Sequence, residues 1–546
     1  MEPTLAVRAE NRIVLMAPVT AGPGVVMSAA AITESTKGFP SILFGEAVGL
    51  AGAESPPPYF SDLNLDQVEA ALVAGRDQYH LEPFFRVRLR DPDAVRYRQD
   101  VFRDLETPPI RGVIDAFAAA MAEVRLRLTR ADARYGHYEQ ARWFLDAARE
   151  YVDAVVRLAD DLARQEPDSA GLRGLVDHLG GYLDSAGFTR LRTDAGRVAD
   201  VLAGLRYNVW LRGARVTVAP YDDEADLSVD IVRTFERFQR EPAERKEPRR
   251  GESASQLDPL EERILDQVAL VFPEEFAALD EFRRRHDRFV DPVIGRFDRE
   301  VQFYLAWLDL VAPIRDAGLT LELPRVSADS QAEVVYDTFD LALALHLVPD
   351  GRPVVTNDLS LSGPERILVI TGPNNGGKTT TARAIGQLHH LAALGVPVAG
   401  RRAELFLCDA IYTHFERRED PAALTGKLGE ELTRFAADFS RATPRSLVIM
   451  NEMFSSTSAS DALELSLAML RRVDELDALG VCVTFLDELS DFGPKAVSMV
   501  CGIDPDDPAV RTFRLARRRA DGRAYARALA RKYGLGADQL ERRVQA

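Results

Sequence analysis

The residues best suited to chemistry are concentrated in a short segment that reads GPNNGGKT and satisfies the pattern G-x-x-x-x-G-K-[ST]. Glycines let the backbone curl so that successive N–H groups point at phosphate oxygens, and the N-terminus of a following helix adds positive partial charge. The lysine can reach the β- and γ-phosphates, and the next hydroxyl can ligate magnesium. The segment therefore predicts a binding loop for ATP and Mg²⁺. Its residues are Gly372, Pro373, Asn374, Asn375, Gly376, Gly377, Lys378, Thr379 and Thr380.

Two secondary-structure elements must hold this loop. The apolar run Ile367–Ile370 precedes it and is typical of a buried strand, while Ala382, Ile385 and Leu388 recur at helical spacing after it. The loop is therefore expected between the end of a strand and the beginning of a helix.

A phosphate-binding loop also needs an acidic group at the end of a neighbouring strand, which holds magnesium and orients the attacking water. The run Leu447–Met450 is such a strand, and Asn451 and Glu452 follow it. Asn451 stands where an aspartate is usual, and its amide oxygen accepts hydrogen bonds without bringing charge. We predict Thr379 and Asn451 on the magnesium side, Glu452 as the residue that polarises the water, and reduced metal affinity and turnover.

Residues 335–546 alternate short apolar runs with amphipathic helical stretches. This alternation is typical of an α/β domain with a buried, largely parallel sheet. The runs are Pro353–Val355, Ile367–Ile370, Leu405–Leu407, Leu447–Met450 and Val481–Phe485.

Residues 41–334 are mainly helical in pattern and are expected to form a core and lever region. Two apolar stripes predict long helices that pack side by side. The alternating runs Val209–Leu211 and Val216–Val218 predict a small hairpin. Residues 239–256, rich in charge, proline and serine, predict an exposed or disordered loop, and residues 1–40 a flexible tail. The stripes are Phe144, Ala148, Tyr151, Val155, Leu158 and Leu162, and Phe289, Val293, Phe297, Val301, Tyr304 and Leu308.

Composition limits the classes of protein that fit. The chain has 546 residues, 46% of them apolar and 28% charged, which excludes wholesale disorder and a multi-span membrane protein. A net charge of -17 repels polyanions at long range, so a nucleic-acid contact needs local basic clusters, for which Arg283–Arg285 and Arg517–Arg519 are candidates. Three cysteines without a CxxC pair indicate neither a disulfide framework nor a zinc site. We expect a cytoplasmic protein without a membrane partner.

Several C-terminal motifs resemble those of the MutS family of DNA mismatch-repair ATPases, a branch of the ABC-type ATPases. The segment Thr371–Thr380 is similar to the nucleotide loop of that family, and Thr457, Ser458 and Asp461 match its later signature. Further similar segments are Asn357–Leu361, Thr413 after Ile411–Tyr412, Glu431–Thr433, and Arg523–Ala526 followed by Ala530.

This resemblance implies an α + α/β fold, in which a long-helix core and lever region precedes a P-loop ABC-type α/β ATPase domain. It implies hydrolysis of ATP with Mg²⁺ in a homodimer, where Ser458 of one subunit approaches the γ-phosphate held by the other. Ser458 therefore joins Lys378 and Glu452 as a candidate catalytic residue. The resemblance also implies DNA as a partner.

The match to the family is incomplete. Phe454 and Ser456 replace signature glycines, and the histidine that follows the next strand in the family is absent, with Asp487 near its place. Phe44–Glu46 formally matches the mismatch-reading F-x-E, but too few residues surround it to form the domain that presents that motif. We therefore expect nucleotide binding more than fast hydrolysis, and no mismatch readout of the usual kind.

Two functional hypotheses follow. One is a dimeric MutS-like ATPase whose nucleotide state is coupled to DNA binding in repair or recombination. The other is a nucleotide-gated interaction protein with very slow or no hydrolysis and a protein partner. A generic ABC-type chromosome-structure or transport ATPase is disfavoured, because long coiled-coil heptads are few and no membrane partner is indicated.

Overall fold

The structure is a computed structural model that describes residues 5–8, 39, 41–45, 54–133, 136–212, 215–222, 259–416, 426–455, 457–504 and 510–520. The chain forms two compact units with interleaved segments. Unit 1 contains residues 1–39, 104–168 and 172–298, and unit 2 contains residues 40–103, 169–171 and 299–546. The helices α3 (Pro92–Leu105) and α11 (Pro292–Asp316) contribute residues to both units. The domains expected from the sequence are continuous ranges, and their boundaries stay a prediction.

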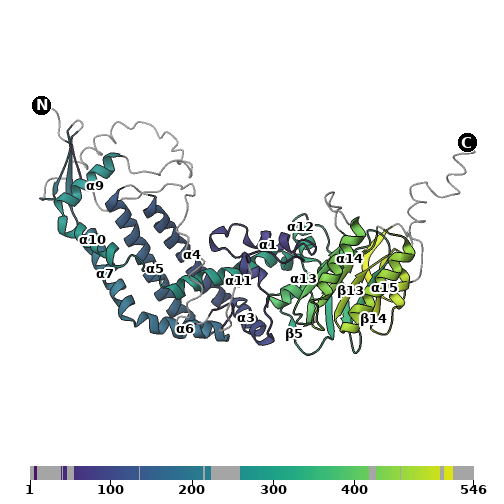
Figure 1. Ribbon diagram of the computed structural model, residues 1–546. Helices are drawn as coiled ribbons and strands as arrows, with labels where there is room; N and C mark the ends of the chain where they lie inside the picture. The colour runs from purple at the N-terminus through teal and green to yellow at the C-terminus, as the bar shows by residue number, and fades with distance from the viewer. Residues whose placement is uncertain are drawn as a thin grey trace, which may run out of the picture. The chain divides into compact units, whose positions relative to one another are not determined.

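Unit 1 is built on long helices, of which α4 and α5 pack along one another (Figure 1). The first apolar stripe lies on α5 and all its members are buried, as are those of the second stripe, which begins just before α11. The Phe289 ring lies 5.2 Å from that of Phe144 and 5.5 Å from that of Tyr151. The expected core packing of both stripes is confirmed. The helices are α4 (Pro108–Asp132), α5 (His137–Gln165), α6 (Ala170–Leu183), α7 (Ala186–Ala203), α9 (Pro259–Val271) and α10 (Pro273–Arg285).

The predicted hairpin is present in unit 1. Strands β2 (Tyr207–Arg212) and β3 (Arg215–Pro220) pair antiparallel, and β1 (Leu5–Arg8) pairs with the other side of β2. Strand β1 falls within the range expected to be a flexible tail, so that expectation is wrong for Leu5–Arg8. Most of the remaining tail, and the loop predicted at residues 239–256, lie outside the described residues.

The centre of unit 2 is a six-stranded sheet in the order β11-β12-β13-β8-β14-β15. The first five strands run parallel, as expected, and β15 is antiparallel to β14. The strands are β8 (Ile367–Thr371), β11 (Ile411–Phe415), β12 (Leu447–Asn451), β13 (Leu479–Val483), β14 (Ala496–Ile503) and β15 (Arg511–Arg517).

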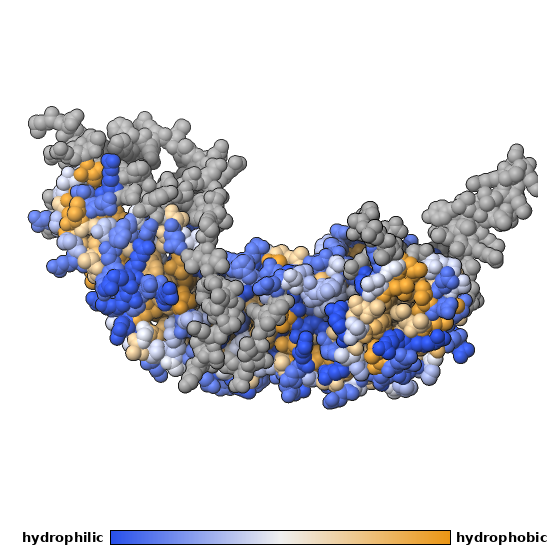
Figure 2. All heavy atoms as spheres, in the orientation of Figure 1, coloured by the Kyte–Doolittle hydropathy of each residue, from blue (hydrophilic) through white to orange (hydrophobic). Residues whose placement is uncertain are grey.

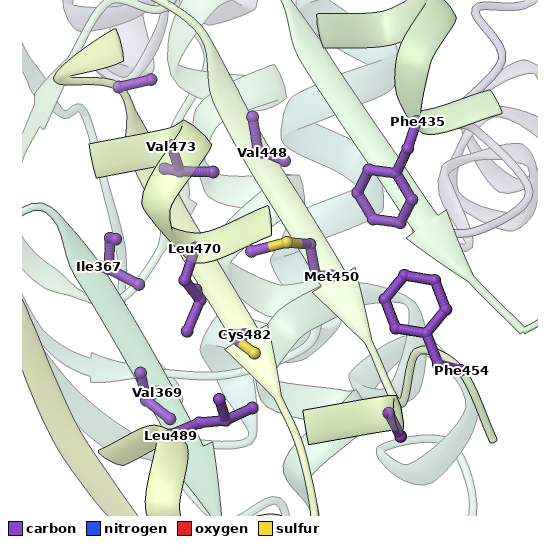
Figure 3. Packing of buried hydrophobic residues seen from close by; sticks show 12 residues of the cluster. Ile367, Val369, Phe435, Val448, Met450, Phe454, Leu470, Val473, Cys482 and Leu489 are labelled. Carbon is purple, nitrogen blue, oxygen red and sulfur yellow. The ribbon is translucent and has the colours of Figure 1, made fainter. Parts of the chain in front are cut away.

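Helices cover both faces of this sheet. Figure 3 shows Val448 and Met450 of β12 in a cluster with Leu470 of α15 (Ala459–Leu476) and Phe435 of α14 (Gly426–Phe439). Ile449 points to the other face, where it meets α13 (Lys378–Ala393). Because both faces are buried, these strands read as continuous apolar runs.

A second sheet has the order β5-β10-β6-β7, and two of the runs expected in the parallel sheet do not lie there. Pro353–Val355 is not a strand, because a proline lacks the N–H for a ladder, and β7 begins at Asn357 instead. Leu405–Leu407 overlaps β10, which is a strand but belongs to this second sheet, where it pairs parallel with β5 and antiparallel with β6. The strands are β5 (Arg325–Ser327), β6 (Glu333–Thr338), β7 (Asn357–Leu361) and β10 (Arg401–Phe406), with β4 (Leu321–Glu322) and β9 (Val398–Ala399) forming a separate pair.

The N-terminal segment of unit 2 packs against α13. Gln387 donates a hydrogen bond of 2.8 Å to the Leu63 carbonyl and another of 2.8 Å to Asp340, the N-cap of α12 (Leu341–Leu347). His390 is fully buried between the Tyr59 hydroxyl and the Phe85 carbonyl. The helices of this segment are α1 (Leu65–Val73), η2 (Asp77–Tyr79) and α2 (Glu82–Arg86).

The cluster under α14 and α15 reaches the surface. Leu463, Leu467 and Met469 are half-buried at its margin, and Figure 2 shows apolar side chains exposed over these two helices. Among the described residues, no helix is long and apolar enough to cross a membrane.

We expect Gly386→Ala to lower the free energy of unfolding by about 1–3 kcal/mol, because the added methyl overpacks a filled interface. Its Cβ would lie 2.6 Å from both δ carbons of Leu63 and 2.9 Å from the δ carbon of Ile449. The matched change Gly196→Ala in α7 meets no atom within 4 Å and should raise stability by about 1 kcal/mol. Urea titration followed by circular dichroism measures both. A Gly386 variant as stable as the Gly196 variant would contradict this packing.

His390 should make unit 2 sensitive to mild acid. Burial lowers the pKa of His390 from 6.5 to about 3, with a smaller contribution from Arg88. Between pH 6.5 and pH 3 the unfolded chain binds a proton at His390 and the folded chain does not. The free energy of unfolding is therefore unaffected by this group above pH 6.5 and decreases by about 1.4 kcal/mol per pH unit as the pH falls towards 3. His390→Gln keeps a donor for the Phe85 carbonyl but does not titrate. Urea unfolding between pH 7.5 and 5 should show a shallower loss in this variant, and equal slopes would refute the assignment.

Candidate functional site

Three chain segments meet at one edge of the parallel sheet. Strands β12, β13 and β8 are neighbours, so the segments that follow them emerge side by side. The loop Gly372–Gly377 follows β8, Asn451 and Glu452 stand at the end of β12, and Phe485 follows β13. The sheet thus brings together the glycine-rich loop and the polar pair that the sequence singles out.

Glycine is required in the loop for both conformation and space. Gly372 has φ 127° and Gly377 has φ 94°, which are left-handed values that favour glycine. A Cβ on Gly372 would lie 2.9 Å from the Cβ of Cys501 on β14, and one on Gly376 would lie 3.0 Å from the Pro373 carbonyl oxygen. The loop therefore packs closely against strand β14 of the sheet.

Lys378, the first residue of α13, has a side chain only 2% exposed. Its ammonium donates to the carbonyls of Gly372, at 3.0 Å, and Pro373, at 3.1 Å. It also lies 3.9 Å from a carboxylate oxygen of Glu452. Burial lowers the pKa of Lys378, and the Glu452 carboxylate opposes that shift.

Phe485 is a site residue that the sequence did not predict. Its ring centroid lies 3.9 Å from the Lys378 ammonium, a cation–π distance, although the residue is 51% exposed. Asp487, which stands near the place of the absent histidine, lies two residues further on and begins η3 (Asp487–Asp491). The available signal was an aromatic residue at the end of the apolar run Val481–Phe485.

Asn451 and Glu452 offer oxygen atoms next to the loop. Burial raises the pKa of Glu452, with Lys378 opposing the shift. Asn451 is buried, and its Oδ1 has no hydrogen-bond partner among the described residues, as is also true of Thr371 Oγ1. Within those residues no group of three His, Cys, Asp or Glu side chains could hold a metal. An unpartnered oxygen nevertheless fits Mg²⁺, which commonly takes one or two protein ligands with waters and phosphates.

The other predicted loop residues occupy the expected positions. Asn374 and Asn375 are exposed at the tip of the loop, and Asn375 has φ 57°. Thr379 and Thr380 are half-buried in the first turn of α13.

Phe454 shows how a signature glycine is replaced. Its φ is 57°, so the backbone keeps a conformation that glycine adopts without strain. The fully buried ring lies 6.0 Å from that of Phe435, and its N–H donates to Glu431. Phe454 therefore combines a left-handed backbone conformation with a side chain packed in the core. Ser456 lies outside the described residues.

Ser458 is exposed and caps α15. Its hydroxyl accepts a hydrogen bond of 3.2 Å from the Asp461 N–H and lies 3.0 Å from the Ser460 hydroxyl. These bonds stay within the first turn of α15 and none of them reaches the loop. A role for Ser458 across a subunit interface stays a prediction.

Asn357 fixes β15 beside the loop. Its side chain donates to the Phe513 carbonyl at 3.1 Å and accepts from the Leu515 N–H at 2.7 Å. Arg511 of the same strand donates to the Asn374 carbonyl at 3.1 Å. The motif at Asn357 thus contributes to the wall of the site.

The candidate basic clusters are engaged by acidic side chains. Arg284 and Arg285 both pair with Glu281, and Arg285 also pairs with Asp194. Arg517 pairs with Glu365. These ion pairs reduce the positive potential available to a polyanion.

Phe44 packs within unit 2. The half-buried ring lies 6.2 Å from the ring of Phe84, and the Arg98 guanidinium lies 5.0 Å from its centroid. Whether Phe44 reads a mismatch is not tested by this packing, and its exclusion from that role stays a prediction.

Comparison with known proteins identifies related sequences. Residues 368–502 match the family MutS domain V. The DNA mismatch repair proteins MutS of two Chloroflexus aurantiacus strains are each 30% identical over 174 residues, which is 32% of this chain and 17% of the relative. The matched region therefore spans about a sixth of the length of these relatives.

Asn451→Asp should make stability depend on magnesium. A carboxylate buried without a partner costs about 3–5 kcal/mol, and a bound cation would offset that cost. We expect a lower melting temperature than the wild type in EDTA, and a larger gain on adding Mg²⁺. The matched variant Asn451→Leu, which removes the oxygen, should show no response to Mg²⁺. If all three proteins respond alike, Asn451 does not face a cation site.

Proposed function

Because this chain belongs to the MutS family through its domain V, we propose that it is a MutS-like ATP-binding protein that works as a dimeric ATPase. In this proposal its nucleotide state is coupled to DNA binding in repair or recombination, without the usual mismatch readout. The observation that carries the proposal is the meeting of the Gly372–Gly377 loop, Lys378 and Glu452 at one edge of a parallel sheet.

Each group at this edge suits one part of phosphoryl transfer. Backbone N–H groups of the loop and the N-terminus of α13 attract phosphate oxygens, and the Lys378 ammonium neutralises their charge. Thr379 and Asn451 would hold Mg²⁺, which supplies further neutralisation when bound. Glu452, half-buried and with a raised pKa, is suited to accept the proton of a water that attacks the γ-phosphorus as ADP leaves.

Slow turnover is part of this proposal. Asn451 brings no negative charge to the metal, and the ring that faces Lys378 from the segment after β13 is the non-titrating Phe485. The arrangement favours nucleotide binding over rapid hydrolysis.

A second candidate is a nucleotide-gated interaction protein with a protein partner. The pairing of Arg284, Arg285 and Arg517 with carboxylates favours it, because those arginines then offer less charge to DNA phosphates.

ATP binding and turnover measured on one preparation test the proposed site. Lys378→Ala should weaken ATP binding about 10- to 150-fold, the value of hydrogen bonds to a charged group. Glu452→Gln should keep affinity within about threefold and lose at least about 100-fold in turnover. The control Lys495→Ala removes a lysine held by Asp474 and Asp477 and should change neither quantity. Wild-type protein without saturable ATP binding would reject the proposal.

DNA binding on the same preparation separates the two candidates. An ATP-dependent, salt-sensitive gel shift that is lost in Lys378→Ala supports DNA as the partner. Saturable ATP binding without any such shift supports the protein-partner candidate.

A further inference from the structure

We propose that Phe485 is a positioning residue that competes with phosphate for Lys378. In this inference, which rests on the proposed nucleotide site, the ring holds the ammonium in the free protein and moves aside when a polyphosphate binds.

The Lys378 ammonium is surrounded by two carbonyl oxygens, an aromatic ring and a carboxylate. It carries three N–H donors, two of which bond to the carbonyls of Gly372 and Pro373. The Phe485 ring, at 3.9 Å, and the Glu452 carboxylate, at 3.9 Å, take up the remaining side of the charge. An incoming phosphate must therefore replace one of these partners.

The ring is the partner that can leave most easily. The carbonyls belong to the loop backbone, which is pressed against Cys501, whereas the Phe485 side chain is 51% exposed. Its backbone is held on both sides, because the Thr484 N–H donates to the Ile370 carbonyl at 3.1 Å and the Thr484 hydroxyl accepts from the Leu486 N–H at 2.9 Å. A change of side-chain rotamer alone can then uncover the ammonium, without movement of the strand.

The free energy of the contact between the Phe485 ring and Lys378 depends on how far the ammonium is withdrawn from water. Cation–π attraction increases when the cation is withdrawn from water, and the Lys378 side chain is 2% exposed. Loss of the ring should therefore tighten polyphosphate binding about 3- to 30-fold.

Calorimetric titration of wild type, Phe485→Ala, Phe485→Leu and Phe485→Tyr with ATP and with inorganic tripolyphosphate tests the inference. We expect the alanine and leucine variants to bind both ligands more tightly by a similar factor, and the tyrosine variant to resemble the wild type. Phe485→Leu keeps apolar bulk, so agreement between leucine and alanine excludes a change in folding as the cause. The control Leu343→Ala removes a 39% exposed apolar side chain from α12, away from the loop, and should not tighten binding.

The two ligands distinguish competition from base stacking. If Phe485→Ala weakens ATP but leaves tripolyphosphate unchanged, the ring contacts the nucleoside and the inference is wrong. Unchanged affinity for both ligands also overturns it, while the proposed function stands if Lys378→Ala still weakens ATP binding. If neither the wild type nor any variant binds either ligand, both the proposed site and this inference fail.

Discussion

The buried ammonium of Lys378 is the group around which unit 2 is organised. Withdrawing such a charge from water costs several kcal/mol unless partners surround it. Its partners come from the loop after β8, the residue after β12 and the ring after β13. Only adjacent parallel strands deliver three such segments to one point, so the strand order is a condition for the site. The glycines complete the arrangement, because a loop with side chains could not lie against β14.

Much of this fold could be predicted because its signals are local. The strand at Ile367–Ile370, the helix after Lys378, the hairpin and the stripe on α5 each follow from periodicity within a few turns of chain. The predictions fail where contacts between distant segments of the chain determine the secondary structure or the sheet to which a strand belongs. Leu405–Leu407 is as apolar as the strands of the parallel sheet, since α13 packs near β10, yet β10 lies in a separate mixed sheet between β5 and β6. The strand at Leu5–Arg8 depends on a partner some 200 residues away.

The same distinction applies to the site. A glycine-rich loop and a lysine form one continuous motif, so their positions could be read from the sequence. That the Phe485 ring faces the lysine depends on β13 lying between β12 and β8, and strand order cannot be read from any single segment. The role of Asn357 likewise requires β7 and β15, which lie some 150 residues apart, to be close in space.

The packing of residues 57–65 on α13 has a consequence for dissecting the molecule. The Leu63 side chain packs over Gly386. Gln387 forms a hydrogen bond with the Leu63 carbonyl, and His390 forms one with the Tyr59 hydroxyl. A fragment excised at residue 335 would keep every motif of the nucleotide loop and still expose an interior face of the helix that carries it. A fragment that keeps the site intact must therefore contain two segments, the sheet with its helices and the upstream residues 57–65 that pack on α13.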